Sequence, residues 1–258
     1  MLVPGKTRID FSGGEVLLDA SNLKLIEYAA QKLGKDSIGV STSGVFLDNA
    51  SLEILSKSVK DVELTLDCVP LMTYNLRPRS YHSYVMYAVK RLKEYNISVG
   101  VQTVLTKKNM SNEIIDDLYK CILENGIDTW SILRFFPVGR GMEYMDDCVS
   151  HNECKNVVEY IKNLTKGNER LEVDFHYLLP SHKKHTHECR CVKKSIGILP
   201  NGSVIACFWA LNKNMELLDK KFLLGKLPEQ SFKQILTGKQ ASYWKNQHHT
   251  CSLFADCQ

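Results

Sequence analysis

The stretch RIDFSGGEVLLDASN, residues 8–22, decides the fold of this chain, because it runs a short strand into two glycines and an acid. Gly13 and Gly14 allow the backbone to turn sharply and a ligand to approach it closely. Glu15 then offers a carboxylate to a ligand ammonium group or ribose hydroxyl. The alternative is an ordinary turn in which Glu15 is a solvated charge at a helix N-terminus. Taken alone, the tripeptide favours this second interpretation.

Strands and helices alternate from this stretch to about residue 177. The expected strands are short, rich in Val, Ile or aromatic residues, and bounded by Gly, Asn, Asp or Ser. They cover residues 7–12, 37–42, 62–67, 97–104, 129–136 and 171–177. Helical spacing of apolar residues is found over 23–33, 84–95, 111–126 and 151–166. The sequence therefore predicts an α/β fold with a parallel sheet, open or closed into a barrel, and covering helices.

Glycine and polar residues follow the predicted strands, where parallel α/β folds bind their ligands. They are Gly13, Gly14 and Glu15 after the first strand, Thr42, Ser43 and Gly44 after the second, Asp67 after the third, Gln102 and Thr103 near the end of the fourth, and Arg134 near the end of the fifth. The carboxyl ends of the strands are therefore the predicted binding site.

The nine cysteines are unevenly spread. Cys68, Cys121, Cys148 and Cys154 are dispersed and are predicted to be small buried side chains. Five others lie in the last seventy residues, namely Cys189, Cys191, Cys207, Cys251 and Cys257. No secretory signal precedes the first strand, and reducing compartments rarely retain disulfides. The late cysteines are therefore predicted to be metal ligands.

The segment CVKKSIGILPNGSVIAC, residues 191–207, predicts a hairpin with a thiol at either end, because PNGS at 200–203 is a strong turn signal. Soft thiolate ligands suit an iron–sulfur cluster or zinc. The neighbouring histidines His182, His185 and His187 lie in a lysine-bearing polar loop and are interpreted as solvated. A domain boundary is expected near residue 180, which gives domains 1–180 and 181–258.

Composition bounds the function further. A net charge of +4 with scattered lysines does not suggest nucleic-acid binding, and no apolar run approaches the ~20 residues that span a bilayer. The sequence predicts a cytoplasmic protein with no membrane partner.

Together these motifs resemble the radical S-adenosylmethionine (SAM) superfamily, specifically its members with a C-terminal SPASM or Twitch domain. The resemblance rests on DFSGGEVLL for the GGE motif, STSG and LTLD for the second and third strand ends, RFFPVGRG after the fifth strand, and LLGKLPEQSFKQIL (223–236) for the connector that follows the hairpin. The hairpin itself matches the SPASM spacing of Cys, nine to fifteen residues, Gly, four residues, Cys. The resemblance covers nearly all of the chain.

The resemblance implies a partial (β/α)6, TIM-like radical SAM barrel that lacks its first βα unit, followed by a small cysteine-rich SPASM/Twitch domain. Glu15 would hold the amino group of SAM, and Gly13 and Gly14 would allow its close approach. The rest of the SAM pocket would comprise Ser41, Ser43, Asp67, Gln102 and Arg134. The candidate ligands of an auxiliary [4Fe–4S] cluster are Cys189, Cys191, Cys207, Cys251 and Cys257, although the one-residue spacing makes ligation by both Cys189 and Cys191 awkward. The family chemistry is reductive cleavage of SAM to a 5′-deoxyadenosyl radical, which abstracts hydrogen from a substrate.

The sequence departs from the family at both ends. The CxxxCxxC motif that holds the catalytic cluster is absent, and His248 stands where the second cysteine group of the family begins. The favoured interpretation is a fragment of a complete enzyme, and the alternative is a degenerate protein that kept the fold. On either interpretation this chain alone is expected not to cleave SAM.

The resemblance implies a peptide or protein substrate and an electron donor such as a flavodoxin or ferredoxin. It nominates no catalytic acid or base. One alternative is a non-catalytic binding module with a structural zinc site in its Cys/His tail. Another is an open α/β nucleotide-binding protein unrelated to SAM, which leaves the cysteine hairpin unexplained.

Overall fold

The computed structural model describes residues 4–70, 77–78, 80–176 and 191–246. Contacts within the chain divide it into two compact units. The first combines Met1–Arg134 with Glu153–Leu178, and the second combines Phe135–Asn152 with Leu179–Gln258. Each unit is described by itself.

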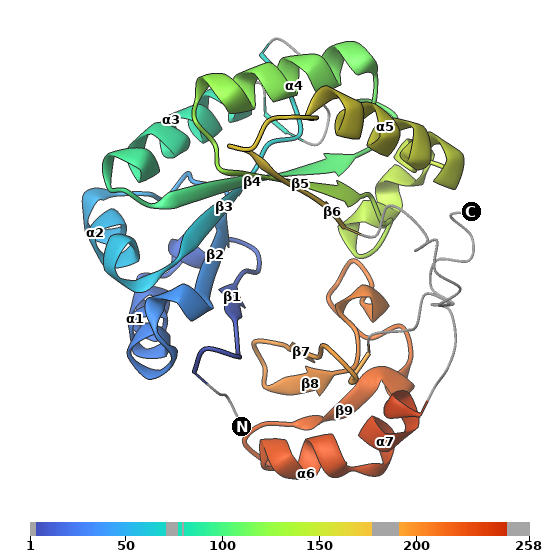
Figure 1. The fold of residues 1–258 in the computed structure, drawn as a ribbon. Coiled ribbons are helices and arrows are strands. Elements are labelled where there is room, and N and C mark those ends of the chain that lie inside the picture. Colours follow the sequence, from blue (N-terminus) through green and yellow to red (C-terminus); the bar gives the residue numbers. More distant parts are fainter. Residues whose placement is uncertain (1–3, 71–76, 79, 177–190, 247–258) are drawn as a thin grey trace. The chain divides into compact units, whose positions relative to one another are not determined.

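The first unit is a parallel sheet with helices along one side (Figure 1). Its six strands lie side by side in the order of the chain: β1 (Ile9–Phe11), β2 (Ile38–Thr42), β3 (Asp61–Thr65), β4 (Ser98–Leu105), β5 (Thr129–Arg134) and β6 (Glu172–His176). The helices are α1 (Ser21–Leu33), α2 (Asn49–Ser58), α3 (Tyr81–Glu94), α4 (Asn112–Glu124) and α5 (His151–Leu164). The predicted α/β fold with a parallel sheet is confirmed.

The two faces of this sheet differ in chemistry. Leu64, Val101 and Trp130 occupy one row across β3, β4 and β5 and are fully buried. The next row, Thr65, Gln102 and Ser131, lies on the opposite face and is polar. Parallel strands covered on both faces usually carry continuous apolar runs. The alternation found here therefore shows that only one face belongs to the apolar core.

One helix of the first unit was not expected from the sequence. Helix α2 begins after Asp48, whose carboxylate accepts a hydrogen bond from the Ser51 backbone N–H at 2.7 Å, while the Ser51 hydroxyl meets the Asp48 backbone N–H at 2.9 Å. This reciprocal capping box satisfies two N–H groups that the first helical turn leaves without partners. The signal was present in the sequence as an Asp placed before an apolar run.

The second unit contains the predicted hairpin. Strands β7 (Gly197–Ile198) and β8 (Ser203–Ile205) are antiparallel, and β9 (Leu223–Lys226) adds a third strand where only a connector was expected. Gly202 in the turn has φ = 83°, and a Cβ there would lie 2.2 Å from the Leu227 carbonyl oxygen. Glycine is therefore required at this position. Helices α6 (Phe232–Thr237) and α7 (Lys239–Lys245) follow.

The segment after β5 belongs to this second unit. The Phe136 and Trp209 rings lie 4.8 Å apart, and the Gly139 backbone N–H donates to the Leu211 carbonyl at 3.2 Å. The chain thus changes unit directly after Arg134, a position that no change in composition marks. The boundary expected near residue 180 lies outside the described residues. Across the described part of the chain, no helix combines the length and apolar character of a membrane span.

Candidate functional site

Glu15 lies directly after β1 and is held by side chains that follow β2. Its Oε1 accepts hydrogen bonds from the Leu17 backbone N–H at 3.0 Å and from the Thr42 hydroxyl at 2.5 Å. Its Oε2 accepts from the Ser43 backbone N–H at 2.8 Å and from the Ser43 hydroxyl. Because β1 and β2 are neighbours in the sheet, their carboxyl ends place these groups together. The GGE turn and the STSG turn therefore meet at the carboxyl ends of β1 and β2.

These contacts set the charge of Glu15. Its partial burial acts to raise the pKa of the carboxyl group, but the hydrogen bonds from Ser43, Thr42 and Leu17 outweigh burial and lower the pKa below its usual value. Glu15 is therefore a fixed anion at neutral pH. It also serves as the N-cap of the short 3-10 helix η1 (Val16–Leu18), which is the structural role that the sequence allowed as an alternative.

The two glycines before Glu15 leave open space beside the backbone. Gly13 has φ = +145°, and no heavy atom lies within 4 Å of a Cβ built at Gly13 or Gly14. A ligand can therefore approach this turn closely, which a side chain at either position would hinder.

Gln102 and Ser41 lie on the polar face of the sheet, Gln102 within β4 and Ser41 one residue before the end of β2. Ser41 pairs in register with Glu63, and the Gln102 side-chain amide donates a hydrogen bond to the Glu63 carboxylate. Burial raises the pKa of Glu63, and hydrogen bonds from Ser131 and Gln102 oppose that rise without cancelling it. Glu63 and Ser131 were not predicted. The signal that could have found them is the alternation of apolar and polar residues over 62–65 and 130–132.

Substituting Glu63 by glutamine is expected to stabilise the protein more at pH 7 than at pH 4. The pKa of Glu63 is higher in the folded chain, so its stabilising contribution is present at low pH and is lost as the pH rises and the buried carboxyl ionises. The Glu63→Gln amide oxygen still accepts a hydrogen bond. We expect a gain of about 0.5–1 kcal/mol at pH 7 in chemical denaturation. Glu159→Gln, at an exposed residue of α5, is the matched control. An equal effect of Glu63→Gln at both pH values would contradict this account.

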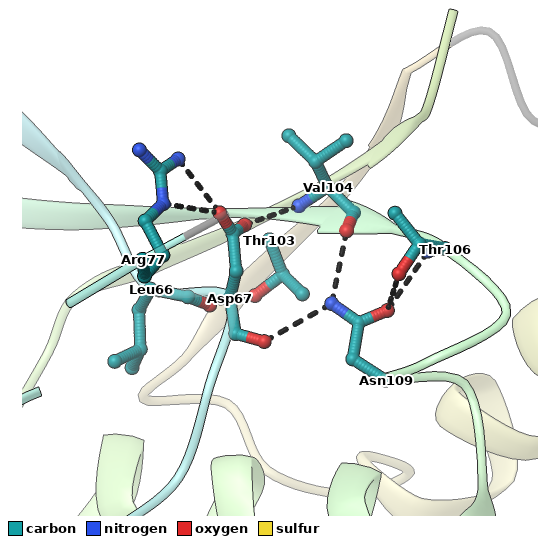
Figure 2. A network of polar contacts seen from close by, with 7 residues as sticks. All are labelled: Leu66, Asp67, Arg77, Thr103, Val104, Thr106 and Asn109. Atoms are coloured by element: carbon teal, nitrogen blue, oxygen red, sulfur yellow. Dashed lines mark hydrogen bonds and ion pairs between the residues drawn. The ribbon is translucent and has the colours of Figure 1, made fainter. Parts of the chain in front are cut away.

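Asp67 lies just beyond β3 in a polar network shown in Figure 2. Its Oδ2 pairs with the Arg77 guanidinium at 2.7 Å, and its Oδ1 accepts from the Val104 backbone N–H at 2.8 Å. Burial raises the pKa of Asp67, and the charge of Arg77 opposes this rise. The network engages both carboxylate oxygens of Asp67 and holds the Arg77 guanidinium. The expected contact of Asp67 with SAM stays a prediction.

Asn109 completes the network, and sequence reasoning missed it. Its amide donates to the backbone carbonyls of Asp67 at 3.0 Å and Val104 at 2.9 Å, while its oxygen accepts from the Thr106 backbone N–H at 2.8 Å (Figure 2). Asn109 is fully buried. It thereby joins the carboxyl ends of β3 and β4. Arg134, another predicted SAM residue, lies at the end of β5 in register with Leu105.

The second unit brings together two of the predicted cluster ligands. A hydrogen bond with the Cys191 thiol lowers the pKa of Cys207 to about 7 against the opposing effect of burial, and the backbone N–H groups of Trp209 and Ala210 add to the lowering. Cys207 caps the short 3-10 helix η4 (Phe208–Ala210). Two converging thiols, one of which ionises readily, fit the thiolate donor set of an iron–sulfur cluster or zinc.

The other predicted ligands, Cys189, Cys251 and Cys257, lie outside the described residues. Within the described ranges, no group of three or more His, Cys, Asp and Glu side chains could hold a metal ion.

Residues 189–258 match the family model of SPASM, an iron–sulfur cluster-binding domain. A GTP 3′,8-cyclase of Clostridium perfringens (strain 13 / Type A) is 23% identical over 171 residues, which are 66% of this chain and 52% of that protein. The chain therefore spans about half the length of the curated relatives it matches.

Solved structures share the fold. Streptococcus suis SuiB bound to S-adenosylmethionine has a TM-score of 0.70 at 19% identity, over 90% of this chain and 55% of SuiB. Native anSMEcpe with bound AdoMet and Kp18Cys peptide has a TM-score of 0.67 at 17% identity, over 97% of this chain and 74% of that chain. Residues 189–258 of this chain thus match an iron–sulfur cluster-binding domain, and the chain shares its fold with SuiB and anSMEcpe.

Proposed function

We propose that this chain is the SAM-binding and auxiliary-cluster part of a radical SAM enzyme that modifies peptides or proteins by hydrogen abstraction. The observation that carries the proposal is the fixed Glu15 anion beside the open Gly13–Gly14 turn at the carboxyl ends of β1 and β2. Parallel α/β folds bind ligands at this edge.

Glu15 would bind the ammonium group of SAM. Four donors of the chain already surround its carboxylate, and two of them are the hydroxyls of Thr42 and Ser43. Because a hydroxyl hydrogen can rotate away, a hydrogen bond from the ammonium group can replace the one from either hydroxyl. The two backbone N–H groups would keep the carboxylate fixed. Ser41, Gln102 and Arg134 would complete the pocket along the neighbouring strands.

A peptide or protein substrate is supported by two solved relatives of the same fold. One is SuiB bound to the precursor peptide SuiA, with a TM-score of 0.71 at 17% identity over 97% of this chain. The other is the anSMEcpe complex, which holds a peptide together with AdoMet. The polar face of the sheet, with Glu63, Gln102 and Ser131, offers hydrogen-bonding groups to such a substrate.

The auxiliary [4Fe–4S] cluster, which takes four cysteine ligands, would be held by Cys191 and Cys207 with two of the three residues Cys189, Cys251 and Cys257. Iron–sulfur clusters supply the one-electron chemistry by which SAM is cleaved in this family. The sequence contains no CxxxCxxC motif, so this chain alone is proposed to bind SAM without cleaving it. A cytoplasmic location and a flavodoxin or ferredoxin as electron donor remain part of the proposal.

Anaerobic reconstitution of the whole chain with iron and sulfide is expected to give at most one [4Fe–4S] cluster, together with measurable SAM binding in equilibrium dialysis. Cys207→Ser is expected to lose most of the bound iron, because it removes a thiolate that the hairpin holds ready. Cys154→Ser, at a buried cysteine of α5, is the matched control and should retain the iron.

Metal analysis separates this proposal from a non-catalytic zinc module. About one zinc per chain with no iron uptake would favour the zinc module. Iron uptake without SAM binding would favour a degenerate barrel that kept only its C-terminal cluster.

A further inference from the structure

Three side chains with nitrogen and sulfur donors meet between helices α3 and α4 of the first unit. The Cys121 Sγ atom lies 3.5 Å from the His82 Nε2 atom and 3.3 Å from the Met86 Sδ atom. His82 and Met86 are one helical turn apart, so both project from the same face of α3. Figure 1 shows α3 and α4 as neighbouring helices on the covered side of the sheet. All three side chains are half-buried.

This combination of donors is chemically selective. Thiolate and thioether sulfurs bind soft ions such as Cu(I), and imidazole suits copper as well, whereas carboxylates and carbonyls suit Mg²⁺ and Ca²⁺. Among the described side chains, the hydrogen bonds and sulfur contacts of Cys121 involve His82, Met86 and the Asn125 amide at 3.7 Å. Carboxylate ligands are not part of this set, so the cluster suits a soft ion better than a hard one.

The distances also suit a three-coordinate ion. Bonds of about 2.0–2.3 Å from a metal to nitrogen and sulfur place the donors of a trigonal site roughly 3.5–4 Å apart. The Cys121 sulfur lies 3.5 Å from His82 Nε2, at the lower end of this range, and 3.3 Å from Met86 Sδ, just below it. We propose that Cys121, His82 and Met86 form a binding site for a soft monovalent metal ion of the Cu(I) class.

Binding would convert the Cys121 thiol to a metal-bound thiolate and release its proton to solvent, with no change in oxidation state. The Asn125 amide, which also donates to the Cys121 carbonyl at 2.8 Å, is placed to donate a hydrogen bond to the sulfur. Such a second contact orients a metal ligand and tunes its donor strength. These residues belong to helices of the first unit, whereas the cysteines of the SPASM region belong to the second.

The test uses the whole chain, labelled with ¹³C at the methionine methyl groups and titrated with Ag(I), a redox-inert analogue of Cu(I). The chain has seven methionines, and the spectrum of Met86→Leu assigns the Met86 methyl resonance. We expect this resonance to shift and to saturate with one ion at the site. Ag(I) that binds other cysteines leaves it in place, and Zn²⁺ is expected not to move it.

Cys121→Ser is expected to abolish the shift or to weaken it at least about tenfold. Cys121→Ala is the second variant should the serine protein fail to fold, and Cys154→Ser is the control that should keep the shift. Thermal unfolding verifies that each variant is folded. An unmoved Met86 resonance in wild-type protein that takes up Ag(I) elsewhere would overturn the proposal, and so would a shift that survives loss of the Cys121 thiol. Either result would leave the cluster as a packing contact between two helices.

Discussion

Asn109→Ala is expected to lower the free energy of unfolding by about 3 kcal/mol or more. Asn109 is fully buried, and its amide joins three backbone groups: the carbonyls of Asp67 and Val104 and the N–H of Thr106. Alanine leaves all three without that partner inside the protein. Each buried polar group that loses its hydrogen bond costs roughly 1–3 kcal/mol.

Urea denaturation of the whole chain measures this effect. The fluorescence of Trp130, which is buried in the sheet, reports the unfolding of the first unit. Asn163→Ala provides the matched control, because Asn163 is an exposed residue of α5. We expect that control to change stability by less than about 0.5 kcal/mol. Equal stability losses in the two variants would show that the network does not join the ends of β3 and β4 as described.

The second large effect is expected in SAM binding. Glu15→Gln keeps the shape of the side chain and one accepting oxygen but removes its negative charge. A hydrogen bond to a charged group contributes about 1.5–3 kcal/mol, so SAM is expected to bind roughly 10- to 150-fold more weakly. Equilibrium dialysis of the reconstituted chain measures this change. Glu159→Gln, at an exposed glutamate of α5, should bind SAM as the wild type does.

The pH dependence of SAM binding gives an independent measure of the same residue. Because its hydrogen bonds hold the pKa of Glu15 below the usual glutamate value, the anion persists through neutral and mildly acidic solution. Its contribution to binding is therefore present above the usual glutamate pKa and is lost only as the pH falls below it. Unchanged SAM affinity in Glu15→Gln would assign Glu15 to the alternative role, the N-cap of η1.

The two variants test different properties of the same edge of the sheet: Asn109→Ala tests its stability, and Glu15→Gln tests its ligand binding. Asn109 joins β3 to β4 through backbone groups, so its loss should be visible in stability even without a ligand. Glu15 already has partners from η1 and β2, so its substitution should be visible mainly in affinity. A variant that lowers both the free energy of unfolding and the SAM affinity would indicate that ligand binding requires all the strand ends at this edge to be correctly arranged.

Local sequence determined the elements and their order. Strands such as 37–42 and 97–104 were predictable because short Val- and Ile-rich runs between turn residues carry their own signal. The hairpin at 191–207 was predictable for the same reason, since PNGS requires a turn and Gly202 accepts the positive φ that this turn needs. The meeting of Glu15 with Ser43 followed from a rule of parallel sheets, which places the ends of neighbouring strands at one edge.

Tertiary structure decided the partners and the units. Asp67 was expected beside a ligand, but its side chain pairs with Arg77 and its carbonyl accepts from Asn109, residues 10 and 42 positions further along the chain. The segment 135–152 joins the second unit through packing of Phe136 on Trp209, which sequence periodicity cannot express. Cys121, His82 and Met86 come together because two amphipathic helices cover adjacent strands. Contacts between residues far apart in the sequence depend on how these elements pack, and local patterns carry no record of that packing.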